Sequence, residues 1–118
     1  MKNIIFVFLI CLFSNTLFSQ KNYCLTASDD SRIVAAGGSI TEILFFLGQE
    51  KKIVALDVTS TYPEQTKKLP SIGYVRGLSA EGILSMNPSL IIGENDMGPP
   101  AVVNQLKEID IDLRTIPE

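Results

Sequence analysis

The chain has 118 residues, a formal net charge of −3 and no histidine. A mildly acidic chain of about one domain's length, without a basic cluster, is a poor candidate for binding nucleic acid. The absence of histidine excludes Ser-His-Asp and Cys-His catalytic sites, and histidine-based zinc sites, within this chain.

The first residues have the pattern of an export signal. Lys2 supplies a positive start, ten apolar residues follow without interruption at 4–13, and a more polar exit ends at Ser19. Ten apolar residues are too few to cross a bilayer as a helix, which takes roughly 20. We therefore predict that residues 1–19 are a signal peptide of a secreted protein, cleaved after Ser19.

Residues 20–31 are polar and lack periodicity, so we expect a flexible tether there. A regular alternation of apolar runs and amphipathic segments fills residues 32–118. The short apolar runs predict parallel strands at 33–36, 53–56 and 90–93, and the alternation of residues 111–116 predicts a fourth strand. The segments between them predict helices or helical turns at 39–47, 63–68, 79–86 and 101–109.

Two of these helices carry a capping signal at their start. Ser39 and Glu42 form a capping box, and Ser79 precedes the third helical segment. Gly48 is expected to end the first helix. Spacing predicts the buried faces of the first and last helices, which are Ile40, Ile43, Leu44 and Leu47, and Val102, Val103, Leu106 and Ile109.

This order of elements predicts an α/β fold, with a Rossmann-like parallel sheet flanked by helices on both faces. The sequence stops at Glu118, directly after the fourth predicted strand. A parallel strand buried on both faces needs more covering structure than this. We therefore expect residues 32–118 to be an incomplete domain, and the chain to be a fragment.

Ligands of open α/β sheets bind outside the carboxyl ends of the strands. The loops expected there are 37–39, 57–76 and 94–100. The first of them, Gly37-Gly38-Ser39, could cradle a phosphate at a helix N-terminus. It does not form the G-x-G-x-x-G pattern of dinucleotide sites, so we favour a plain strand-to-helix turn.

The glycine-framed loop 73–77 is more unusual. Tyr74 and Arg76 point the same way if the segment is extended. A neighbouring cation favours the phenolate form of tyrosine, and phenolate is a ligand of ferric haem iron. A surface tyrosine beside a solvated arginine is the alternative explanation, and composition alone favours that alternative.

Several stretches resemble a known family. Residues 32–43 and 57–63 resemble the N-terminal lobe of the iron and cobalamin class (class III) of periplasmic binding proteins. Residues 69–88, with their Gly-Tyr-x-Arg and Leu-Ser-Ala-Glu-Gly motifs, and Gly98-Pro99-Pro100 narrow the resemblance to the haemin-binding proteins of bacterial haem ABC importers. The resemblance runs from about Arg32 to the last residue and implies the N-terminal lobe of a two-lobed fold, without the second lobe.

The resemblance also implies roles for individual residues. Tyr74 would ligate the haem iron, Arg76 would stabilise its phenolate, and Tyr62 would line the ligand cleft. Glu81 falls where the class carries an exposed acidic residue that docks on arginines of the membrane permease. Its place in the first turn of a helix also suits the helix dipole, which is the alternative explanation.

Together these inferences predict a monomeric periplasmic protein that captures haemin and delivers it to an ABC permease in the inner membrane. Haem would be its cargo, and the protein would not be an enzyme. The nearest alternative keeps the fold but binds cobalamin or a ferric siderophore, ligands that do not require a protein phenolate on iron. The second alternative is a small flavodoxin-like or nucleotide-binding enzyme, which the signal segment and the lack of an acid–base pair disfavour.

Overall fold

A computed structural model describes residues 25–117. The predicted signal peptide and residues 20–24 of the predicted tether lie outside the described residues. No helix within 25–117 is long and apolar enough to cross a membrane. The elements are, in chain order, β1 (Ile33–Ala36), α2 (Gly38–Phe46), the 3-10 helix η1 (Glu50–Lys52), β2 (Ile53–Leu56), the 3-10 helix η2 (Glu64–Lys68), α3 (Ala80–Leu84), β3 (Leu90–Glu94), α4 (Pro100–Glu108) and β4 (Asp112–Ile116).

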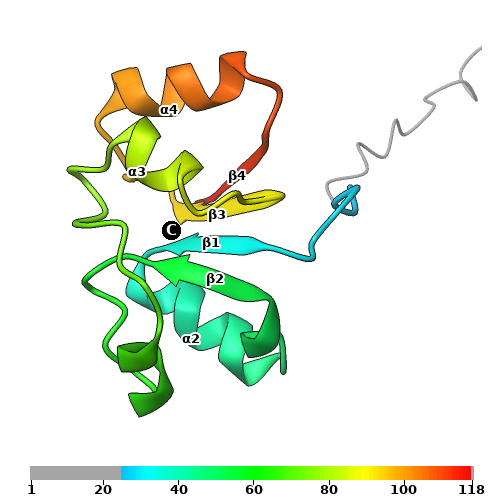
Figure 1. The fold of residues 1–118 in the computed structure, drawn as a ribbon, viewed down its shortest axis with the longest axis vertical. Helices are drawn as coiled ribbons and strands as arrows, with labels where there is room; N and C mark the ends of the chain where they lie inside the picture. Colours follow the sequence, from blue (N-terminus) through cyan, green and yellow to red (C-terminus); the bar gives the residue numbers. More distant parts are fainter. Residues whose placement is uncertain (1–24, 118) are drawn as a thin grey trace, which may run out of the picture.

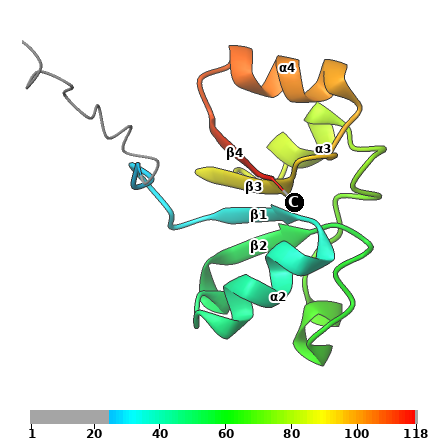
Figure 2. The ribbon, with the colours of Figure 1, turned by 180° about the vertical axis from the view of Figure 1, so that it is seen from behind.

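The four strands form one parallel sheet in the order β2-β1-β3-β4. Helix α2 lies on one side of it and α3 and α4 lie on the other (Figures 1 and 2). The predicted α/β class is therefore confirmed. Because the chain crosses from β2 past β1 to β3, the topological switch point lies between the carboxyl ends of β1 and β3, where ligands of such sheets bind.

The core has two halves because successive residues of a strand point to opposite faces. Every residue of β1 is buried. Val34 and Ala36 belong to the cluster that packs under α3 and α4, which includes Ile83 and Leu106. Ile33 and Ala35, on the other face, belong to the α2 cluster. Burying one such aliphatic side chain contributes about 1.5–3 kcal/mol, which stabilises β1 between the two layers of helices. The edge strand β4, in contrast, is partly buried or exposed along its length.

The capping prediction is right for one helix and wrong for the other. Ser79 caps α3, and its hydroxyl accepts a hydrogen bond from the Gly82 amide at 3.0 Å. Helix α2, however, begins at Gly38 with Gly37 as its N-cap residue and without a side-chain cap. Gly37 has a φ of 131°, a conformation open to glycine, so the chain turns before Ser39. The Ser39 hydroxyl instead donates to Glu94 Oε1 at 2.7 Å.

The predicted buried face of α2 is half right. Ile40 and Leu44 are buried, whereas Ile43 and Leu47 are 52% and 60% exposed. Thr41 is fully buried in their place. Its hydroxyl shares a hydrogen bond of 2.7 Å with the Ser60 hydroxyl, which draws that side of the helix inward.

The last helix follows its prediction except at its end. Leu106 is fully buried, and Val102 and Val103 are partly buried against the same cluster. Ile109 is 48% exposed. It lies one residue beyond α4, at the C-cap position with φ −94° and ψ 17°, so helical spacing no longer directs its side chain to the core.

Candidate functional site

Three loops meet at the carboxyl edge of the sheet and are tied together by backbone hydrogen bonds. The Val58 amide donates to the Gly73 carbonyl at 2.9 Å, which joins the loop after β2 to the loop that bears Tyr74. Gly98, in the loop after β3, donates to the Val75 carbonyl at 2.9 Å and accepts from the Leu78 amide at 2.8 Å. These bonds form one continuous rim, which we define as residues 57–63, 71–78 and 94–100.

Tyr74 stands on the central segment of this rim. Its neighbour Val75 and the nearby Leu78 are both buried and anchor the segment, while the tyrosine is 48% exposed. Gly73 has a φ of 95° and open space where a side chain would stand. The loop therefore presents a partly exposed phenol from an anchored backbone, with room for a flat ligand to approach it.

Arg76 lies beside Tyr74 and is paired with a residue from another loop. Its Nε donates to Asp96 Oδ2 at 2.6 Å, and its Nη2 contacts the same oxygen. The pKa of Arg76 is raised, first by the hydrogen bond and charge of Asp96 and to a lesser extent by Tyr74. The guanidinium thus contacts Asp96 directly, in the same turn that carries Tyr74. Asp96 is not among the residues predicted from the sequence.

Tyr62 and Glu81 lie in other parts of the same region. Tyr62 is 66% exposed in the loop between β2 and η2, so it belongs to the rim but stands largely free of the protein. Glu81 is exposed in the first turn of α3, where its carboxylate also suits the positive end of the helix dipole. The structure therefore brings Tyr74 and Arg76 together with Asp96, and it places Glu81 on a helix that follows the rim.

A buried carboxylate stabilises the chain next to the switch point. Asp57 is fully buried directly after β2. It accepts hydrogen bonds from the Gly37 amide at 2.9 Å, the Thr59 amide at 3.0 Å, the Thr59 hydroxyl at 2.6 Å and the Ser60 hydroxyl at 2.8 Å. A carboxylate can be buried when its oxygens are satisfied in this way. Asp57 therefore fixes the start of α2 against the loop that leads to Tyr62.

The turn at Gly37 is not arranged to hold a phosphate. The Gly37 amide is already bonded to Asp57, and a Cβ at Gly37 would collide with the Glu94 carboxyl group. A phosphate in this position would meet two carboxylates, and like charges at short range repel. This geometry argues against the nucleotide-binding alternative and agrees with a plain strand-to-helix turn.

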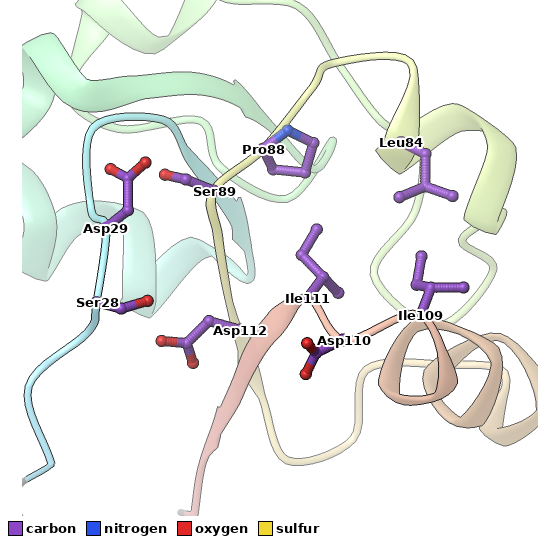
Figure 3. A pocket seen from close by; sticks show the side chains of 9 residues that line it. All are labelled: Ser28, Asp29, Leu84, Pro88, Ser89, Ile109, Asp110, Ile111 and Asp112. Atoms are coloured by element: carbon purple, nitrogen blue, oxygen red, sulfur yellow. The ribbon is translucent and has the colours of Figure 1, made fainter.

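A hollow of about 670 Å³ opens at the opposite, amino edge of the sheet. Figure 3 shows its lining, which includes Asp29, Asp110 and Asp112 beside apolar side chains and none of the predicted site residues. Asp112 pairs with Arg114 at 2.9 Å, and Asp29 accepts a hydrogen bond from the Ser31 amide at 2.8 Å. Across residues 25–117 no group of three or more carboxylate, thiol or imidazole side chains is placed to hold a metal ion. The rim remains the candidate ligand site.

Known proteins resemble this chain over the same region. The sequence profile described as "periplasmic binding protein" matches residues 33–115. The periplasmic haem-binding protein RhuT from Roseiflexus sp. RS-1 is 48% identical, with a TM-score of 0.72, over 75% of this chain and 34% of that chain. A periplasmic haem-binding protein from Pseudomonas aeruginosa is 45% identical, with a TM-score of 0.71, over 74% of this chain and 31% of that chain.

A vitamin B12-binding protein of Yersinia pestis is also similar, at 32% identity over 89 residues, which are 75% of this chain and 32% of that protein. The chain thus spans about a third of the length of the relatives it matches. The matched part agrees with the predicted N-terminal lobe of a two-lobed protein.

Proposed function

This chain belongs to the periplasmic binding protein family, and from that premise we propose that it captures haemin in the periplasm and delivers it to an ABC permease. Haemin is then cargo, and the protein catalyses no reaction. The observation that carries the proposal is the partly exposed Tyr74 phenol, held on an anchored rim with Arg76 beside it. Phenolate is a ligand of ferric haem iron.

Haemin is favoured over cobalamin and siderophores on two grounds. The identity to the two haem-binding proteins, 48% and 45%, exceeds the 32% identity to the vitamin B12-binding protein. Cobalamin and ferric siderophores, in addition, do not require a protein phenolate. A tyrosine with a neighbouring cation at the ligand edge of the sheet has a direct use in ligating haem iron.

The ligand is tested with the purified full-length protein, ferric haemin and cyanocobalamin. We expect haemin to produce a saturable change in visible absorption that excess cyanocobalamin does not displace. Because a ligand that binds the native state raises its stability, haemin should also raise the melting temperature. A rise with cyanocobalamin and none with haemin would contradict the proposal and favour the cobalamin alternative.

Export is tested at the N-terminus. If residues 1–19 act as a signal peptide, the mature protein in a periplasmic extract should begin at or near Gln20, because the apolar run and its polar exit direct cleavage after Ser19. N-terminal sequencing measures this directly. A soluble mature protein that retains Met1 would contradict the export prediction.

Glu81 is proposed to dock on the permease and not to capture the ligand. Glu81→Lys should reduce haem transport on the order of tenfold while leaving the affinity for haemin unchanged, because charges at the edge of an interface act mainly on encounter and orientation. Transport into permease-containing vesicles and haemin titration measure the two effects separately. The matched control is Glu108→Lys, the same reversal at an exposed position of α4. Equal transport by both variants would show that Glu81 has no docking role.

A further inference from the structure

We propose that Asp96 competes with an anionic ligand for the Arg76 guanidinium, and that this competition weakens capture and favours release. The inference rests on the proposed function and deepens it, because it assigns a role in ligand exchange to a residue outside the predicted site. Asp96 would act through Arg76 and would not touch the iron, so it is a positioning residue.

The contacts between Asp96 and Arg76 are the basis of the proposed competition. One oxygen of Asp96, Oδ2, accepts a hydrogen bond from Arg76 Nε at 2.6 Å and also contacts Nη2 of the same guanidinium. The other oxygen, Oδ1, is buried and has no hydrogen-bond partner among residues 25–117. Arg76 is thus the one cation that compensates Asp96 in the described part of the chain. A ligand carboxylate that needs these guanidinium donors has to displace Asp96 from them.

The backbone of the loop that bears Asp96 is held in place by hydrogen bonds and by a buried side chain. Gly98 is bonded to Val75 and Leu78, and the Met97 amide donates to the Glu94 carbonyl at 3.0 Å. Met97 itself is buried. Arg76, in contrast, has a side chain that is 62% exposed, against 32% for Asp96. The arginine is therefore the partner that can turn away, and Asp96 is a fixed competitor for it.

The chemistry of haemin makes this competition relevant. Haemin carries two propionate carboxylates, and a guanidinium binds carboxylates through paired N–H donors. Tyr74 and Arg76 stand in one turn, closed by the hydrogen bond from the Gly77 amide to the Tyr74 carbonyl at 2.8 Å, so a ligand on the phenol lies near the guanidinium. A protein that delivers its cargo has to release it, and an internal carboxylate that reclaims Arg76 lowers the free energy needed for release.

The test removes the charge of Asp96 and keeps its shape. Asp96→Asn in the full-length protein should bind haemin about two- to fivefold more tightly, the range expected for one exposed ion pair. Transfer of haemin to apomyoglobin should slow by a similar factor. The visible spectrum should keep its phenolate character, because the variant leaves Tyr74 unchanged.

Three comparisons test whether Asp96 affects haemin binding through Arg76. In an Arg76→Ala background, Asp96→Asn should give at most half of the gain seen with Arg76 present. With haemin dimethyl ester, whose carboxylates are blocked, the gain should disappear. The matched control, Asp110→Asn, neutralises an exposed carboxylate at the opposite edge and should leave haemin affinity unchanged.

The outcomes that would contradict this inference differ from those that would contradict the proposed function. Unchanged or weaker haemin binding by Asp96→Asn would overturn the inference while leaving the proposed function intact. An equal gain with and without Arg76, or with the dimethyl ester, would also overturn it, because Asp96 would then act directly on the ligand. A wild-type protein that does not bind haemin at all would overturn the proposed function, and this inference with it.

Discussion

Tyr74→Phe in the full-length protein is expected to abolish the charge-transfer absorption typical of phenolate-bound ferric haem. It should also weaken haemin binding roughly tenfold or more, which corresponds to about 1.4 kcal/mol or more. The reason is that phenylalanine keeps the ring and deletes only the oxygen that would ligate the iron. Visible spectroscopy and a haemin titration measure the two effects.

The same substitution should have little effect on folding. The side chain is 48% exposed, and the rim is anchored by Val75 and Leu78, which the variant keeps. Surface changes of this kind usually alter the free energy of unfolding by less than about 0.5 kcal/mol. A variant that loses the absorption at unchanged melting temperature would therefore report ligation and not damage to the fold.

Tyr62→Phe is the matched control. It deletes the same hydroxyl from another rim tyrosine, which is 66% exposed, and it should keep the charge-transfer absorption with a smaller change in affinity. An unaltered haem spectrum in Tyr74→Phe would exclude Tyr74 as the iron ligand. The cobalamin or siderophore alternative would then be the better explanation of the site.

The elements of the fold were predictable where their signals are local. A buried parallel strand is a continuous apolar run, and three such runs became β1, β2 and β3; the alternating residues 111–116 became β4, which is only partly buried or exposed. The limits of all four strands differ from the predicted ones by one residue at most. The Ser79 cap depends on contacts within one turn of helix, so its sequence pattern was sufficient. Tyr74 and Arg76 stand in a single short loop, but that loop is not extended as the prediction assumed, because the Gly77 amide donates to the Tyr74 carbonyl at 2.8 Å and closes a turn.

The predictions are wrong or incomplete where a residue distant in the sequence determines the local structure. The start of α2 is set by Gly37, whose amide is bonded to Asp57, 20 residues away. Arg76 and Asp96 are likewise separated by 20 residues. A sequence shows that two loops reach the same edge of a sheet, but not which side chains meet there. The signal available for Asp96 was only its place in a loop after a predicted strand.

Asp57→Ala should destabilise the protein by about 3–4 kcal/mol, a large effect for one substitution. The carboxylate is fully buried and accepts four hydrogen bonds. Its removal leaves the buried Gly37 amide and Ser60 hydroxyl without this acceptor, and unsatisfied buried donors are costly. Urea unfolding of the full-length protein, followed by circular dichroism, measures the loss.

Asp57→Asn keeps the shape of the side chain and tests whether the lost acceptor oxygens cause the destabilisation. An amide offers one acceptor oxygen and points an N–H₂ group at donors, so it should recover only part of the lost stability. The matched control is Glu108→Ala, which removes an exposed carboxylate of α4 and should change the free energy of unfolding by less than about 0.5 kcal/mol. A loss below about 1 kcal/mol in Asp57→Ala would show that water replaces the lost acceptor. Because Asp57 holds Thr59 and Ser60 in the loop that leads to Tyr62, and that loop is bonded through Val58 to the loop of Tyr74, the affinity of folded Asp57→Asn for haemin should fall.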